Sequence, residues 1–136
     1  MKFDTKIAVV LREDLAVWQK LNVTAFAVSG IAATVPGITG APYEDASGRQ
    51  YLPMFVQPVL AFSANGVELQ AAYARAMEAR VRLAIYTEDL FKTGFDEANR
   101  AVVKAVATAD LNLVGIAFRA ERKASDKILG GLKLHA

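Results

Sequence analysis

The apolar positions of this chain fall into continuous runs of strand length and longer runs of helical length. Residues 6–11, KIAVVL, form a continuous β-branched and leucine-rich run, which is typical of a strand buried on both faces of a sheet. Residues 17–34 carry almost no charge, are rich in Ala and end at Val35-Pro36-Gly37. Because a helix does not readily continue through proline, this second run predicts a mostly buried helix that ends there.

The same alternation continues to the end of the chain. Short apolar runs predict further strands, although Pro58 demotes part of one of them to an edge or a bulge. Apolar residues at helical spacing predict the segments that cover those strands. Strands are predicted at residues 53–63, 81–86 and 111–118, and helices at residues 67–80, 96–108 and 124–129.

The order of these segments predicts the fold class. Residues 35–52, rich in Gly and polar side chains, predict a long loop, and long loops in small domains are often functional or mobile. The remaining order, β-α-β-α-β-α-β-α, is typical of helices covering both faces of a sheet. We therefore predict a single domain over residues 1–136, an α/β protein built as a three-layer α/β/α sandwich with a mixed, mostly parallel four-stranded sheet.

Composition narrows the class of protein. The chain has 136 residues, 54% hydrophobic and 22% charged, a balance that suits one globular core. It has no Cys, which excludes disulfides, thiolate metal sites and cysteine nucleophiles. The apolar run at the N-terminus is too short for a signal peptide, and no run reaches the roughly 20 residues of a membrane span. These features predict a cytoplasmic protein with no membrane association.

Candidate chemistry lies where two predicted strands end. In open α/β sheets, ligands bind in the crevice beyond the carboxyl ends of the strands. The first strand is followed by a stretch that carries several chemically useful side chains, and the third predicted strand is followed by TEDLFKTG. The candidate ligand-binding residues are Arg12, Trp18 and Asn22, and the candidate catalytic residues are Lys20, Asp89 and Thr93.

Each candidate also has a purely structural interpretation. Asp89 and Thr93 suit a general base and its orienting hydroxyl, or a turn and a helix cap. Lys20 suits an oxyanion, or a solvated position at the end of a long apolar stem. Asn22, in an almost uncharged helix, needs partners for its amide and suits a structural network or a ligand. Trp18 suits stacking on a ring or covering the core.

Three short motifs carry a resemblance to a known fold group. The first strand and its corner read KIAVVLREDL, DLFKT follows the third predicted strand, and the chain closes with LVGIAFRA and GGLKLH. In this order they resemble the type II peptidyl-tRNA hydrolases, whose members carry an Arg-x-Asp-Leu corner, an Asp and a Thr four residues apart, and a Gly-x-Leu-Lys-Leu close. The resemblance implies their α/β fold and roles in ester cleavage for Asp89 and Thr93.

The departures from that group point to a relative of unknown function. The hydrolases present a Lys and a Gln one turn apart on the first helix, where alignment from the corner places Leu21 and Ala25; a shift by one residue offers Lys20 and Thr24. Together with Trp-x-x-Leu-Asn after the first strand, the pattern most resembles the uncharacterised family called domain of unknown function 2000. This resemblance names a fold without naming a reaction.

We therefore expect an uncharacterised α/β domain that binds a small molecule in a cleft at the first and third βα loops. The alternative is a peptidyl-tRNA hydrolase-like enzyme or another ester or amide hydrolase. The missing Lys and Gln pair and a net charge of only +2 argue against tRNA as a partner without excluding it. His135 is the only His, and we expect no metal site and no cofactor. A homodimer is a further expectation, because related folds often pair.

Overall fold

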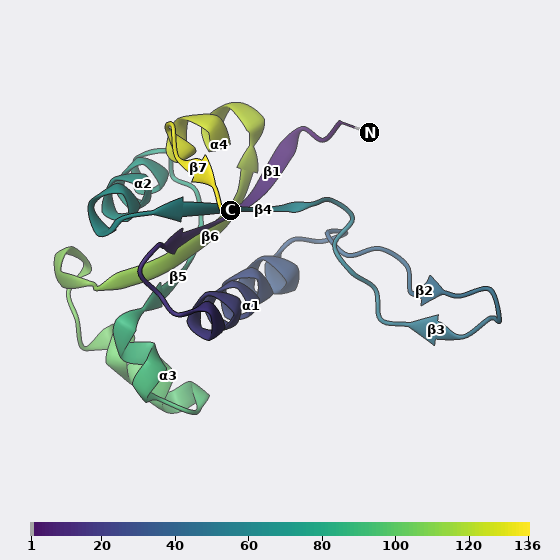
Figure 1. Ribbon diagram of the computed structural model, residues 1–136, viewed down its shortest axis with the longest axis horizontal. Helices are drawn as coiled ribbons and strands as arrows, with labels where there is room; N and C mark the ends of the chain where they lie inside the picture. The colour runs from purple at the N-terminus through teal and green to yellow at the C-terminus, as the bar shows by residue number, and fades with distance from the viewer. Residues whose placement is uncertain (1) are drawn as a thin grey trace.

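The structure, a computed structural model, describes residues 2–136 and consists of a layered body with one projecting arm (Figure 1). None of the helices in this range is long and apolar enough to cross a membrane. In chain order the elements are β1 (Thr5–Arg12), α1 (Val17–Thr34), β2 (Tyr43–Glu44), β3 (Gln50–Tyr51), β4 (Val59–Ala64), α2 (Gly66–Glu78), β5 (Leu83–Thr87), the 3-10 helix η1 (Glu88–Lys92), α3 (Asp96–Lys104), the 3-10 helix η2 (Thr108–Asp110), β6 (Leu113–Glu121), α4 (Arg122–Leu129) and β7 (Lys133–Leu134).

The body is built on a mixed five-stranded sheet in the order β5-β6-β1-β4-β7. β1 pairs in parallel with β4, whereas β6 is antiparallel to both β1 and β5, and β7 is antiparallel to β4. β1, β4 and β5 therefore run in one direction, and their carboxyl ends lie at one edge of the sheet. The α/β class and a mixed sheet are confirmed, but the prediction of four mostly parallel strands is wrong, because the main sheet has five strands and three of its four pairings are antiparallel. β7 was missed because its two residues follow a Gly-Gly pair and carry no apolar run of their own.

One face of the sheet is covered by α2 and α4. Apolar side chains on α2 are fully buried, including Leu69, Ala72 and Ala76, and they pack with Phe118 of β6 and Ile128 of α4. α2 begins at a complete capping box: the Asn65 side chain accepts from the backbone N–H of Glu68 at 2.8 Å, and the Glu68 carboxylate accepts from the Asn65 N–H at 2.9 Å. Burial and capping together account for this helix.

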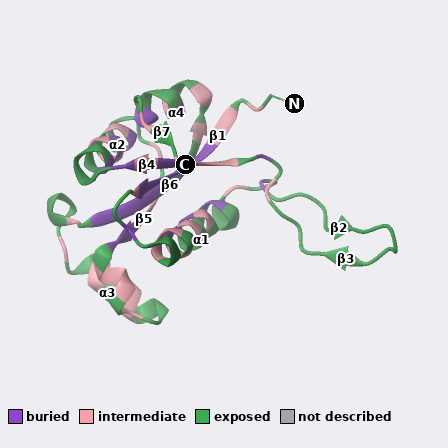
Figure 2. Ribbon diagram, viewed as in Figure 1, coloured by how far each residue is buried: buried purple, intermediate pink, exposed green. Residues whose placement is uncertain are grey.

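The other face is covered by α1, which matches its predicted range of residues 17–34. Val23, Ala27 and Ile31 are buried against β1 and β6. The close approach depends on Gly115 in β6, because a Cβ atom at this position would lie 2.5 Å from Cγ1 of Val23. A glycine within a strand often marks such a contact between backbones or elements. The outer side of α1 stays exposed (Figure 2).

The predicted loop at residues 35–52 is instead part of an ordered antiparallel ribbon. We call residues 39–56 the arm. Its two sides are joined by Val56 N–H to Ile38 O at 2.9 Å, Gly40 N–H to Met54 O at 3.1 Å, and the pairing of β2 with β3. Pro53 and Pro58 keep residues 53–58 out of the main sheet, so β4 begins later than the strand predicted at 53–63. Figure 1 shows the arm projecting well away from the body.

Candidate functional site

A cleft of about 500 Å³ opens between α1 and the segment that follows β5. It lies at the carboxyl end of β5, between the elements that follow the first and third strands of the predicted order. Clefts of 300–1,000 Å³ are typical of small-molecule sites. Its walls come from α1 (Trp18, Asn22 and Phe26), β5 (Tyr86), η1 (Leu90 and Phe91), the turn after η1 (Thr93, Gly94 and Phe95) and α3 (Asp96 and Asn99).

Four aromatic rings form a continuous chain through this cleft. Trp18 meets Phe91 edge to face at a centroid distance of 5.8 Å, Phe91 lies 5.1 Å from Tyr86, and Tyr86 lies 6.1 Å from Phe26. The first and third of these pairs are T-shaped and the second is tilted by 47°, and all three distances lie in the favourable range for aromatic pairs. α1 contributes every fourth residue, because positions 18, 22 and 26 share one side of a helix. The cleft therefore offers flat apolar surface whose geometry is fixed by ring-to-ring contacts.

Two polar groups sit within this aromatic surface. Nδ2 of Asn22 donates a hydrogen bond to the Tyr86 hydroxyl oxygen at 3.3 Å. Burial raises the pKa of Tyr86, and the hydrogen bond from Asn22 opposes this in part, so the phenol is neutral at physiological pH. Within residues 2–136, neither the Tyr86 proton nor the Asn22 carbonyl oxygen has a hydrogen-bond partner. The pair therefore presents two donors, the Tyr86 hydroxyl and the second N–H of Asn22, and one acceptor, the Asn22 carbonyl oxygen, to a bound molecule.

Thr93 lies in the cleft but its hydroxyl is already engaged. Its Oγ1 contacts the Leu90 carbonyl oxygen at 3.1 Å and also contacts the side-chain amide of Asn99. A hydroxyl has only one proton, so Thr93 donates to the Leu90 carbonyl oxygen or to Oδ1 of Asn99, one at a time. Thr93 thus ties the turn after η1 to α3. It is not the cap of α3, which begins after Phe95.

The three candidate catalytic residues do not gather in the cleft. Asp89 is half-buried in η1 but is not among the residues that line the cleft. Lys20 lies across α1 from Asn22, because residues two apart on a helix face away from each other. Its Nζ lies 3.0 Å from Nε2 of His135 in the C-terminal segment. Of the predicted site residues, only Trp18, Asn22 and Thr93 meet in one hollow.

Arg12 connects three loop positions at the same edge of the sheet. Its Nε donates to Oδ1 of Asp14 at 2.6 Å, its Nη1 donates to Oδ1 of Asn112 at 3.3 Å, and its Nη2 lies 3.8 Å from the Glu88 carboxylate. The hydrogen bond from Arg12 lowers the pKa of Asp14. Asn112 also donates to Glu88. Arg12 therefore connects the corner after β1 to the starts of η1 and β6, and it does not line the cleft.

Sequence reasoning missed several residues that complete the cleft. Tyr86, Phe91, Phe95 and Asn99 were not singled out, since each lies within or beside a segment that was interpreted as scaffold. A signal was present for α1: Trp18, Asn22 and Phe26 recur every four residues, which places them on one side of a helix. The matching positions on the far wall come from a 3-10 helix, whose short length gives no such periodicity.

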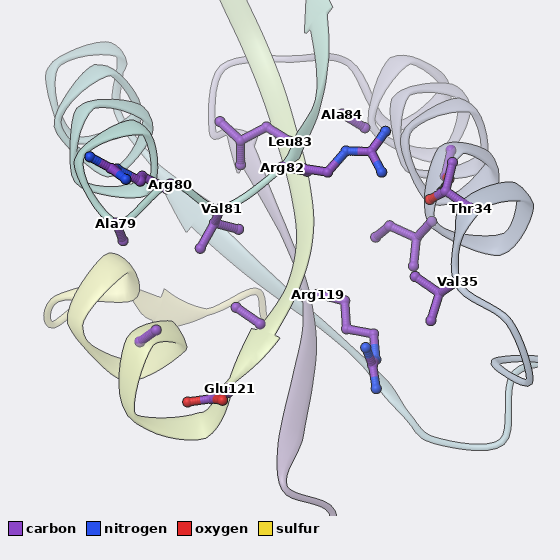
Figure 3. A pocket seen from close by; sticks show the side chains of 14 residues that line it. Thr34, Val35, Ala79, Arg80, Val81, Arg82, Leu83, Ala84, Arg119 and Glu121 are labelled. Atoms are coloured by element: carbon purple, nitrogen blue, oxygen red, sulfur yellow. Dashed lines mark hydrogen bonds between the residues drawn. The ribbon is translucent and has the colours of Figure 1, made fainter.

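A second hollow, of about 590 Å³, lies at the opposite end of β5 (Figure 3). The register that pairs Leu83 with Phe118 places Arg82 opposite Arg119 on the face covered by α1. Figure 3 shows both arginines on the side where Thr34 and Val35 end that helix. Within residues 2–136 no carboxylate forms an ion pair with either guanidinium. This hollow is cationic and open, whereas the aromatic cleft has one charged residue, Asp96, at its rim.

Comparisons with known proteins identify a family and a solved structure, both described as of unknown function. A family model described as "Protein of unknown function (DUF2000)" matches residues 5–136. The solved structure of a protein of unknown function from Agrobacterium tumefaciens strain C58 is 47% identical, with a TM-score of 0.96, and the match covers 99% of this chain and 100% of that one. A comparison with curated proteins finds no match. The peptidyl-tRNA hydrolase-like fold group is not confirmed by these matches.

Proposed function

Since the chain belongs to the DUF2000 family, whose description names no activity, we propose from the geometry that the aromatic cleft binds a small organic molecule. The ligand carries a flat ring for the surface formed by Trp18, Phe91 and Tyr86. It also carries one hydrogen-bond acceptor for the Tyr86 hydroxyl and one donor for the Asn22 carbonyl oxygen. An aromatic carboxamide is the simplest compound with all three features.

The observation that carries this proposal is the unused donor and acceptor inside an aromatic wall. Buried and half-buried polar groups normally find partners, and a hydrogen bond is worth about 0.5–1.5 kcal/mol net when one is provided. Tyr86 is 6% exposed, so most of its side chain is removed from water. A ligand that replaces missing partners and covers exposed rings gains from both effects.

The experiment uses Trp18, which is the only Trp of the chain, as a reporter at the cleft. Benzamide and nicotinamide are titrated while Trp emission and the melting temperature are recorded. We expect saturable quenching and a rise in melting temperature, because a ligand that binds only the folded state stabilises it. Acetamide has the same polar groups without the ring and is expected to act much more weakly.

Matched variants separate binding in the cleft from unspecific effects. Tyr86→Phe removes the hydroxyl and keeps the ring, and Asn22→Leu removes the amide at similar volume; each is expected to weaken binding about 5–10-fold. Tyr73→Phe is the control, because Tyr73 lies on α2 and packs on the opposite face of the sheet. Equal affinity in all three variants, or no ring-bearing amide that binds the wild-type chain, would contradict the proposal.

Catalysis by Asp89, Thr93 and Lys20 stays a prediction. An ester or amide hydrolase needs its acid, base and oxyanion groups around one reacting atom, whereas Lys20 contacts His135 on the other side of α1. Release of nitrophenol from p-nitrophenyl acetate, compared between the wild type and Asp89→Asn, would test the hydrolase alternative directly. A cytoplasmic location and binding of tRNA also stay predictions, which cell fractionation and gel-shift assays would check.

A further inference from the structure

The outer side of α1 is apolar, although nothing between residues 2 and 136 covers it. Lys20 is the only charged residue among the 18 residues of this helix. Val17, Trp18 and Leu21 are 73%, 61% and 67% exposed. A helix that is apolar on all sides is typical of one buried on all sides. The sheet covers only the side of α1 that carries Val23, Ala27 and Ile31. The composition of α1 therefore indicates a second contact surface on its outer side.

The arm, residues 39–56, also exposes apolar side chains to solvent. Its exposed apolar side chains include Leu52 at 83%, Met54 at 57% and the cross-strand pair Tyr43 and Tyr51 at 51% and 52%. An isolated two-stranded ribbon is marginally stable in water and needs packing against another element. Figure 2 shows the outer part of the arm exposed throughout. β2 and β3 contact each other, and the ribbon leads away from the body.

We infer that the arm of one chain packs along the outer side of α1 in a second copy, and that the second copy returns the same contact. From Thr39 to Ser47 the arm spans about 30 Å at roughly 3.3 Å per residue. α1, with 18 residues, spans about 27 Å at roughly 1.5 Å per residue. The arm is thus long enough to follow the whole helix of its partner.

The exposed apolar area also suits a pair of identical chains. A stable interface buries about 800 Å² on each partner. The most exposed apolar side chains of α1 and the arm together present roughly 1,000 Å² per chain when their exposed fractions are applied to full side-chain areas. A two-fold pair in which each arm meets the other helix covers both surfaces in both chains at once. An unrelated partner would have to supply a groove for the arm and a separate surface for α1.

The arm cannot fold back to cover its own α1 without breaking its base. It leaves the carboxyl end of α1 through the turn at residues 35–37 and is anchored there by Ile38, which is 3% exposed. The pairing of Thr39 with Phe55 and the hydrogen bond from Val56 N–H to Ile38 O hold both sides of this base. The direction set by this base points the ribbon away from the helix (Figure 1).

The first test is the mass of the intact chain in solution, measured by sedimentation equilibrium. We expect twice the chain mass at micromolar concentration for the wild type. Leu52→Asp and Leu21→Asp are each expected to weaken the dimer at least about tenfold, since each places a charge in the apolar contact. Val67→Asp is the matched control, because Val67 is 81% exposed but lies on α2. A wild-type chain that is still monomeric at about 100 µM would overturn the inference.

The second test identifies which surfaces meet. The chain has no Cys, so single cysteines can be placed without interference. Chains carrying Leu52→Cys and Leu21→Cys are mixed and oxidised with copper phenanthroline, and a mixed disulfide dimer is expected. Leu52→Cys mixed with Met77→Cys on α2 is the control and should not cross-link, although Met77 is 51% exposed. Equal cross-linking in both mixtures, or a dimer that resists both Asp variants, would overturn the contact between arm and α1.

Discussion

The helices α1 and α2 cover opposite faces of the same sheet but follow different rules. α2 has a capping box, a buried apolar side and charged residues such as Glu68 and Glu78 on the other side. α1 begins at Ala16, which has no side chain able to cap it, and its outer side is apolar. Both helices bury a comparable stripe of three small or branched residues against the sheet.

α2 therefore carries features that stabilise the folded domain, whereas α1 exposes apolar side chains that are available for contact with another molecule. The capping box and the charged residues on the outer side of α2 both favour the isolated domain. On α1 the residues Trp18, Asn22 and Phe26 line the cleft, and Val17 and Leu21 remain uncovered. Exposed apolar residues that contribute little to the stability of the monomer indicate candidate binding surfaces.

The largest expected effect contrasts one leucine from each helix. Leu69 of α2 is fully buried, whereas Leu21 of α1 is 67% exposed. Leu69→Ala is expected to lower the free energy of unfolding by about 2–5 kcal/mol, and Leu21→Ala, measured where the chain is monomeric, by less than about 0.5 kcal/mol. Urea titrations of both variants give the comparison. A similar loss in the two variants would mean that the two helices do not differ in this way.

A smaller effect is expected where α1 approaches the sheet. Gly115→Ala brings a Cβ atom to within 2.5 Å of Cγ1 of Val23 and should cost about 1–3 kcal/mol through displacement of α1. Gly66→Ala is the control in α2, because nothing lies within 4 Å of its added Cβ. Thermal unfolding compares the two. An unchanged melting temperature in Gly115→Ala would show that α1 shifts at no cost.

Substitutions at the two helix caps should change the free energy of unfolding by about 1 kcal/mol in opposite directions. Asn65→Ala removes the acceptor that caps α2 and is expected to destabilise the chain by about 1 kcal/mol. At α1, Ala16 has no side-chain acceptor, and its backbone N–H donates to Oε1 of Gln19 at 2.9 Å. Ala16→Asp supplies the missing acceptor and is expected to stabilise by up to about 1 kcal/mol. Destabilisation by Ala16→Asp would contradict the view that α1 lacks a cap.

The smallest effect is a loss of stability at alkaline pH through Tyr86. Burial raises the pKa of this phenol in the folded state, so the folded chain holds the proton more tightly than the unfolded chain. The resulting stability is complete below the unfolded pKa of about 10 and is lost as pH rises through the folded pKa. Denaturant unfolding between pH 9 and 11 should show a steeper decline in the wild type than in Tyr86→Phe. Parallel curves would argue that Tyr86 is not shielded.

Sequence patterns predicted the body of the fold better than the site. The range of α1 was predicted correctly, and Leu69, Ala72 and Ala76 of α2 fall on its buried side, because helical periodicity is a strong signal. The arm was interpreted as an irregular loop, since β2 and β3 have only two residues each. Their pairing depends on Asp45, which accepts from the N–H groups of Ser47 and Arg49 at 3.0 Å each.

The structure places only some of the predicted site residues in one cleft. The rule that ligands bind beyond the carboxyl ends of strands pointed to this edge of the sheet, and Trp18, Asn22 and Thr93 line a cleft there; their role in binding stays a prediction. Lys20 was expected to join them, but a residue two positions from Asn22 faces another direction. Tyr86 and Phe91 were missed because the stacking of their rings depends on how η1 folds against α1, which no local pattern encodes.

The most direct test of the binding cleft is a ¹H-¹⁵N correlation spectrum of the labelled chain during titration with benzamide. The indole N–H of Trp18 and the side-chain amide of Asn22 report from the wall formed by α1, and the side-chain amide of Asn99 reports from the wall formed by α3. We predict progressive shifts of these three signals with one common dissociation constant, while the signals of Arg82 and Arg119 stay in place. Unmoved signals at Trp18 and Asn22, or shifts confined to the hollow beside Arg82, would contradict the account.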